Sequence, residues 1–181
     1  MLYLAFLRGL NVPGRSVRMD RLRGLFRDMG FDAVRSHIQS GNVFFETPEE
    51  DRSVLSRTIG THLREALGYE VAVCLRTVPE MEELVALDPF KDVDVTDSTR
   101  CCVVFTTEPI DPALELPLLS PKKDMEIIGT TGYEAFVVWH LIKGRAPAAK
   151  GFQERHLGGD ATTRFFHTVV DILAAAKKGA S

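Results

Sequence analysis

The chain has 181 residues, of which 45% are hydrophobic and 26% charged, the composition of an ordinary globular protein. No apolar run approaches the roughly 18 residues needed to span a bilayer, and the net charge of −3 argues against nucleic-acid binding. Three cysteines, two of them adjacent, are a poor disulfide framework, and CxxC and HxxxH pairs are absent. We therefore expect a cytoplasmic protein that needs no metal or cofactor.

The first part of the chain predicts a strand, a helix and a hairpin. The apolar run 2–7 lacks the basic start of a signal peptide and predicts a buried strand. Gly30 ends a segment whose apolar residues follow helical spacing: Met19, Leu22, Leu25, Phe26 and Met29. The segments 33–38 and 43–46 flank a tight turn at 40–42 and predict the hairpin.

A second helix and a fourth strand complete this half. The sequence Thr47-Pro48-Glu49-Glu50 has the pattern of a capping box with proline at the first helical position, and it predicts a helix that runs to Gly68. The segment 70–76 predicts the next strand. The order β-α-β-β-α-β is that of a ferredoxin-like unit.

The second half repeats much of this order. Thr77-Val78-Pro79-Glu80 predicts a second capping box and the start of another helix. The later elements are an aspartate-rich loop at 88–98, a strand at 101–105, a short helix from Asp111-Pro112, a hairpin of 125–128 and 135–139, and a helix near 162–177. We predict an α+β fold with mostly antiparallel sheet, built from a ferredoxin-like half, 1–77, and an incomplete one, 78–181, packed as one compact unit.

Two short polar segments lie at the ends of predicted strands. Their candidate ligand-binding residues are Arg8, Gly9, Asn11, Gly14, Gln39, Ser40, Gly41 and Asn42. A helix crosses over between the first two strands, so these strands run parallel and the two segments lie at the same edge of the sheet. Glycine permits close approach of a ligand, arginine offers planar donors, and asparagine and glutamine offer donors and acceptors. We expect a pocket for an anion, a nucleotide fragment or an acidic small molecule.

The same residues also fit a purely structural interpretation. Asn11 and Asn42 would hydrogen-bond loop backbone, Gly14 and Gly41 would make turns, and Arg8 would pair with a buried carboxylate. The sequence leaves both interpretations open.

Arginine is concentrated near the N-terminus. Residues 1–35 hold seven arginines and three aspartates, a balance of +4, whereas residues 46–100 hold thirteen acidic and six basic residues, a balance of −7. A basic patch of this kind suits a phosphate or another anion. For Arg21, Arg23 and Arg27 we favour a simpler interpretation, the solvated face of a helix.

No catalytic motif of known mechanism is present, and the sequence does not decide whether the protein is an enzyme. His37 precedes the hairpin turn and is the best-placed general acid or base. Ser40 is the hydroxyl in a tight turn, but the GxSxG pattern of a nucleophile elbow is absent. These two residues are the weak catalytic candidates.

Three ordered motifs span nearly the whole chain. They are Tyr3-x-x-Phe6-Leu7-Arg8-Gly9-Leu10-Asn11-Val12, Ile38-Gln39-Ser40-Gly41-Asn42-Val43-Phe44, and Thr162-Thr163-Arg164 with Thr168-Val169. The pattern resembles the bacterial "domain of unknown function 1697" family, which implies a cytoplasmic α+β protein with ferredoxin-like halves and no established activity. The chain departs from the family pattern at Pro13 (usually glycine), His37 (usually tyrosine) and Phe165-Phe166 (usually Asn-Trp).

The third motif adds Thr163 and Arg164 to the candidate ligand-binding residues. Asp160 or Thr162 would cap the last helix, whose exposed amides would favour an anion. An arginine in the first turn opposes the helix dipole, which is understandable if Arg164 serves an anion or a buried partner. The alternative is a capping threonine beside a salt-bridged arginine.

Three classes of function fit these features. We predict binding of an anionic small molecule or nucleotide. A nucleic-acid-binding module is the first alternative, and it needs exposed aromatic residues on central strands, for which Phe44 and Phe45 are the adjacent candidates. The second alternative is a protein-interaction or regulatory module that forms oligomers through its sheet or its terminal helix. The sequence specifies neither a substrate nor an oligomeric state.

Overall fold

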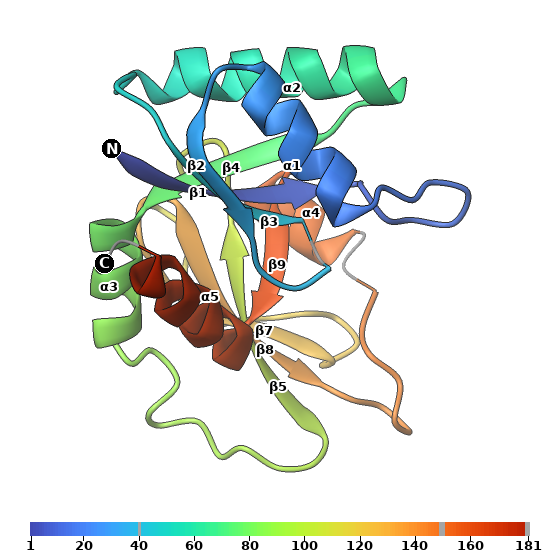
Figure 1. Cartoon of the computed structure of the whole chain (residues 1–181). Helices are drawn as coiled ribbons and strands as arrows, with labels where there is room; N and C mark the ends of the chain where they lie inside the picture. The colour runs from blue at the N-terminus through green and yellow to red at the C-terminus, as the bar shows by residue number, and fades with distance from the viewer. Residues whose placement is uncertain (40, 149–150, 180–181) are drawn as a thin grey trace. The chain divides into compact units, whose positions relative to one another are not determined.

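The chain divides into two compact units (Figure 1). The structure is a computed structural model, and the residues that it describes are 1–39, 41–148 and 151–179. The first unit comprises Met1–Glu83 and Ile172–Ser181, and the second is Leu84–Asp171. Each unit contains one antiparallel sheet, so the fold is α+β, as predicted.

The sheet of the first unit has the strand order β2-β3-β1-β4. Its strands are β1 (Leu2–Arg8), β2 (Asp32–Ser36), β3 (Asn42–Glu46) and β4 (Ala72–Thr77). β1 is antiparallel to both neighbours, and Ala5 faces Val43 on one side and Leu75 on the other. β2 is antiparallel to β3 and therefore parallel to β1, as the crossover helix predicts.

Two helices, α1 (Met19–Asp28) and α2 (Arg52–Leu67), cover one face of this sheet (Figure 1). The residues that they bury are Leu22, Phe26, Leu55, Ile59 and Leu63. Alternate residues of β1 point to the same face, so Tyr3, Ala5 and Leu7 belong to this core. The core therefore fixes β1 up to the point where the first polar loop begins.

The ends of α2 follow the sequence signals only in part. The helix ends at Leu67 and is capped by Gly68, whose φ of 82° is left-handed, as predicted. It begins at Arg52, because the Asp51 carboxylate accepts the N–H groups of Ser53 (2.9 Å) and Val54 (3.1 Å). The capping box predicted from Thr47 is wrong.

The second predicted capping box is confirmed at the start of α3 (Val78–Ala86). The Thr77 N–H donates to the Glu80 carboxylate (2.7 Å), and the Glu80 N–H donates to the Thr77 hydroxyl (3.4 Å). Arg52 Nη2 adds a bond to each oxygen of the same carboxylate, at 2.8 and 2.9 Å. The starts of α2 and α3 are thereby tied together.

The last turn of α5 (Phe166–Lys178) belongs to the first unit and is held by Arg35. The guanidinium donates to the carbonyls of Ala175 and Ala176, both at 3.1 Å. These carbonyls lie in the helix turn that lacks intrahelical donors. A Cβ at Gly179 would overlap the same guanidinium.

The sheet of the second unit has the order β6-β7-β8-β5-β9. Its strands are β5 (Thr99–Phe105), β6 (Leu118–Leu119), β7 (Met125–Thr130), β8 (Glu134–His140) and β9 (Thr162–Phe165). The hairpin of β7 and β8 is the one predicted around residues 129–132. The short helix α4 (Phe152–Leu157) was not predicted.

Two predictions for the second half are wrong. Asp111-Pro112 begins a turn rather than a helix, because the Asp111 carboxylate accepts the Ala113 N–H at 2.9 Å. Thr162 and Thr163 lie in β9 and pair with β5, and α5 begins only at Phe166. β-branched side chains favour a paired strand over the interior of a helix, and the second half does have a last strand.

Two further features concern the cysteine thiols and the length and apolar character of the helices. Burial raises the pKa of the Cys101 thiol and raises that of Cys102 to about 12, and neither of these two thiols is in a disulfide. Within the described ranges, no helix combines the length and apolar character that crossing a bilayer requires.

Candidate functional site

The two polar segments lie together at one end of the first unit's sheet. The Leu7 N–H donates to the Gly41 carbonyl (2.9 Å), and Asn11 Nδ2 donates to the Gln39 carbonyl (3.3 Å) across 28 positions of sequence. The fold therefore brings the loop after β1 against the β2–β3 hairpin.

Gly41 makes this close approach possible. A Cβ at this position would lie 2.9 Å from Leu10 Cδ1 and 3.1 Å from the Leu7 carbonyl oxygen. Its φ of +74° also lies in the left-handed region that favours glycine. The glycine therefore serves contact between the two loops.

The side-chain amide of Asn11 holds the first loop in place with two hydrogen bonds. Besides its bond to Gln39, its Oδ1 accepts the Val17 N–H at 3.0 Å. Between these residues, paired backbone bonds from Val12 to Arg15 enclose Pro13-Gly14, and the φ of +83° at Gly14 has the pattern of a type II turn.

The remaining predicted residues of these segments also contact their own surroundings. Asn42 is 1% exposed, and its Nδ2 donates to the His37 carbonyl at 3.2 Å. Arg8 ends β1 half-buried opposite Ala72, and Gly9 has a φ of +87°. For Asn11, Asn42, Gly14 and Gly41, the structural interpretation that the sequence left open describes the contacts found.

A shallow depression opens beside the joined loops, at the start of α1. Its lining residues are Arg18, Met19, Asp20, Arg23 and Gln39. Arg23 Nη1 donates to the Ser36 hydroxyl at 2.7 Å, which fixes this guanidinium at the end of β2. The Arg18 side chain is 85% exposed and pairs with Asp20 at 3.4 Å. The sequence prediction included Gln39 and missed the others.

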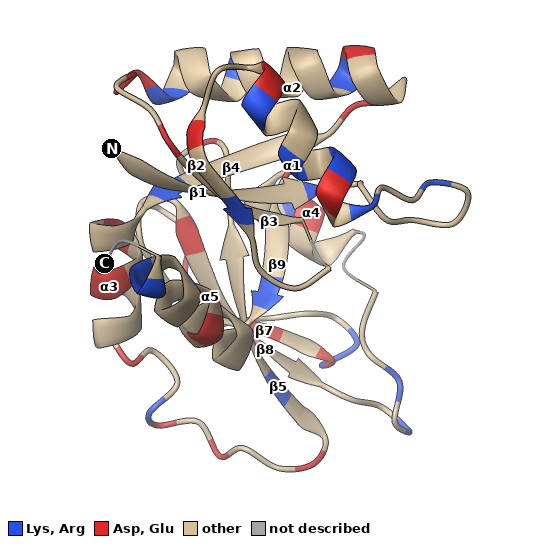
Figure 2. Cartoon of the chain, viewed as in Figure 1, with Lys and Arg blue, Asp and Glu red and all other residues tan. Residues whose placement is uncertain are grey.

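Charges of both signs meet at this depression, and Figure 2 shows both basic and acidic positions on α1. A hydrogen bond from the Arg21 backbone N–H, together with the Arg18 charge, lowers the pKa of Asp20. Asp20 therefore stays ionised and opposes an incoming anion, whereas the two arginines attract it. Counting Arg18, Arg23 and Asp20, the lining has a formal balance of 2 − 1 = +1.

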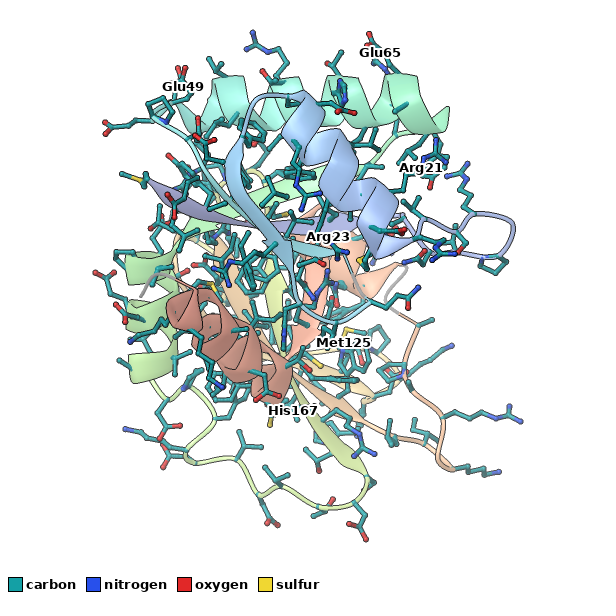
Figure 3. The ribbon with its side chains drawn as sticks, viewed as in Figure 1. Arg21, Arg23, Glu49, Glu65, Met125 and His167 are labelled. Atoms are coloured by element: carbon teal, nitrogen blue, oxygen red, sulfur yellow. The ribbon has the colours of Figure 1, made fainter. Side chains whose placement is uncertain are left out.

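The other α1 arginines have structural partners. Arg21 Nη2 donates to the Ala66 carbonyl of α2 (3.1 Å), and Arg27 Nη2 donates to the Val34 carbonyl (3.5 Å). Figure 3 shows Arg21 and Arg23 leaving α1 on different sides. Only Arg23 of these three lines the depression.

The structure adds no support for a catalytic role of the two weak candidates, His37 and Ser40. His37 is half-buried, and its backbone N–H donates to the Asn42 carbonyl at 3.2 Å. Ser40 lies outside the described residues. In the described ranges, no group of three metal-binding side chains gathers.

Thr163 and Arg164 belong to the second unit and are described there by themselves. Gln153 Nε2 donates to the Thr163 hydroxyl at 2.9 Å, and Arg164 Nη1 donates to the Thr163 carbonyl at 2.9 Å. Their membership of a ligand site stays a prediction.

Comparison with known proteins identifies a family and a fold. Residues 1–136 match the model of the family described as "Protein of unknown function (DUF1697)". The solved structure of the conserved bacterial protein SP0830 from Streptococcus pneumoniae is similar, with a TM-score of 0.72 and 23% identity over 97% of this chain and 98% of that one. No curated protein matches.

Proposed function

We propose that this chain, which belongs to the DUF1697 family of proteins of unknown function, binds an anionic small molecule or a nucleotide at the depression beside its two joined loops. One observation carries the proposal: the side chains of Arg18, Arg23 and Gln39 line a single depression. Guanidinium and amide groups are well suited to phosphate and carboxylate oxygens.

The two arginines differ in how they would bind. Arg23 is held by Ser36, so its donors lose little freedom when an anion arrives. Arg18 is exposed and can leave Asp20 to close over the ligand, because an exposed ion pair contributes at most about 1 kcal/mol. Asn11 supports both by holding the loop that precedes α1 against Gln39.

A small ligand suits the first unit better than a nucleic acid does. Sheets that bind single-stranded RNA stack bases on exposed aromatic residues. Phe44 and Phe45, the aromatic candidates on β3, are 1% and 0% exposed. This burial supports a compact anion rather than a stacked base.

Two finer interpretations accompany the proposal. We infer that the first unit is a ferredoxin-like half, which its element order and its β4-β1-β3-β2 sheet support. We also infer a cytoplasmic location, which the adjacent Cys101 and Cys102, neither of them in a disulfide, support.

Calorimetric titration with inorganic pyrophosphate and with ADP tests the proposal. Arg23→Ala is expected to weaken binding about tenfold, since a hydrogen bond to a charged group contributes about 1.5–3 kcal/mol. Arg57→Ala, which removes an exposed arginine from α2, is the matched control and should leave binding unchanged.

Circular dichroism must first show that Arg23→Ala is folded, because that variant also loses the bond to Ser36. The proposal fails if the wild-type protein binds neither probe, or if both arginine variants weaken binding equally.

A further inference from the structure

A small cavity in the second unit is lined by residues outside the candidate site. It measures about 190 Å³. Its apolar walls and polar rim include Pro121, Met125, Ala148, Phe152, Lys122 and Asp124. An apolar interior with a charged rim is the usual design of a small-molecule site.

Hydrogen bonds of Ser120 hold the turn at one side of the cavity. Ser120 is 4% exposed, and its hydroxyl accepts the N–H groups of Asp124 (3.2 Å) and Met125 (3.1 Å). The same hydroxyl donates to the Asp124 carboxylate at 2.8 Å. The wall is thus formed before a ligand arrives, and the carboxylate of Asp124 is already engaged within the turn.

Lys122 is the charged group that the turn does not use. Among the described residues it has no hydrogen-bond or ion-pair partner, although it lines the cavity. Lys123, its exposed neighbour, is absent from the lining. The ammonium group of Lys122 therefore lies at the edge of the apolar walls, where it can pair with a negatively charged group.

We propose that this cavity binds a small monocarboxylate that carries one ring or a short branched chain. An engineered apolar cavity of about 150 Å³ holds benzene, so about 190 Å³ accommodates one six-membered ring with a carboxylate. The ring packs against Met125 and Phe152, and the carboxylate accepts a hydrogen bond from Lys122 Nζ.

The fluorescence of Trp139 can report ligand binding in this cavity. Trp139 is the single tryptophan and lies directly opposite Met125 in the β7–β8 ladder. Its indole Nε1 is buried and has no hydrogen-bond partner within the part of the chain that the structure describes. A ligand against Met125 changes the surroundings of this ring, and with them its fluorescence.

Fluorescence titration of the full chain with benzoate tests the proposal. Wild type and Lys123→Gln are expected to bind benzoate equally, whereas Lys122→Gln binds it about tenfold more weakly, because it loses the charge-assisted bond. Lys123→Gln makes the same charge change one residue away. Benzamide, which has the same ring without the charge, should bind wild type about tenfold more weakly than benzoate does.

Two outcomes would overturn the proposal. One is no fluorescence change with benzoate in the wild type, confirmed by calorimetry. The other is an equal affinity of Lys122→Gln and Lys123→Gln for benzoate. Both lysines are exposed, so each variant should fold as the wild type does.

Discussion

The asparagine side chains of the two polar loops form hydrogen bonds to the backbone of these loops. Asn11 places both ends of its amide on loop backbone, and the buried Asn42 donates to the His37 carbonyl. Removing such a partner leaves a polar group unsatisfied, which costs about 1–3 kcal/mol when the group is buried. The groups best placed to meet a ligand therefore lie at the rim, on Arg18 and Arg23.

Gly41 and Gly14 form a matched pair for testing the contact between the loops. Both have a positive φ, but an added Cβ meets Leu7 and Leu10 at Gly41 and finds open space at Gly14. We expect Gly14→Ala to lower the free energy of unfolding by about 1–2 kcal/mol and Gly41→Ala by about 3 kcal/mol or more. Urea denaturation measures both, and equal losses would contradict the close approach of the loops.

The sequence could not separate the two roles of Gly41. A glycine in a polar hairpin fits a turn, a ligand approach or a chain contact equally well, and the contact with Leu7 exists only in the folded sheet. Arg18 was missed for a similar reason. Its position beside Gln39 depends on the hydrogen bonds that hold the loop before α1. The spacing of residues in the sequence does not reveal these bonds.

The helix starts show how one pattern gives different outcomes at the scale of elements. Thr47–Glu50 and Thr77–Glu80 both match a capping box, but only the second caps a helix. Near the first, Asp51 provides a stronger cap further along the chain. A local pattern therefore predicts that a helix begins nearby, while competition among neighbouring caps decides where.

The carboxylate of Glu80 makes the stability of the first unit depend on pH. Burial alone would raise the pKa of Glu80, but hydrogen bonds from Thr77 and the Arg52 guanidinium outweigh it and lower the pKa. A lowered folded-state pKa stabilises the fold above the unfolded value of about 4.3, and this contribution is lost as the pH falls through the folded value.

We therefore expect the free energy of unfolding to fall less steeply between about pH 5 and pH 3 in Glu80→Gln than in the wild type. At pH 7 this variant should be about 1 kcal/mol less stable, since the pair with Arg52 is half exposed and screened. Glu83→Gln, an exposed change on the same helix, is the control. Parallel pH profiles for the two variants would contradict the role assigned to Glu80.

At the scale of the whole molecule, the two units differ in how well the sequence predicts them. Every strand of the first unit was expected, because each has a clear apolar run or a hairpin turn beside it. In the second unit β6 has 2 residues, β9 has 4 and α4 has 6, which is too short for a periodic pattern. Pairing with β5 and β7 defines the two short strands.

The two proposed sites also belong to different units. The anion site draws on the loops and α1 of the first unit, and the carboxylate cavity on β7 and α4 of the second. The Arg23 and Lys122 variants therefore test the two proposals independently. Loss of binding at one site does not affect the test of the other site.

Two-dimensional ¹H–¹⁵N NMR during titration with inorganic pyrophosphate tests the central claim most directly. We expect the amide signals of residues 17–23 and 37–39 to shift in a saturable manner, because they surround Arg18, Arg23 and Gln39. Those of α2 residues 55–63 should stay in place. Unchanged signals around Arg18 and Arg23, or shifts spread evenly over all exposed arginines, would contradict an anion site at this end of the sheet.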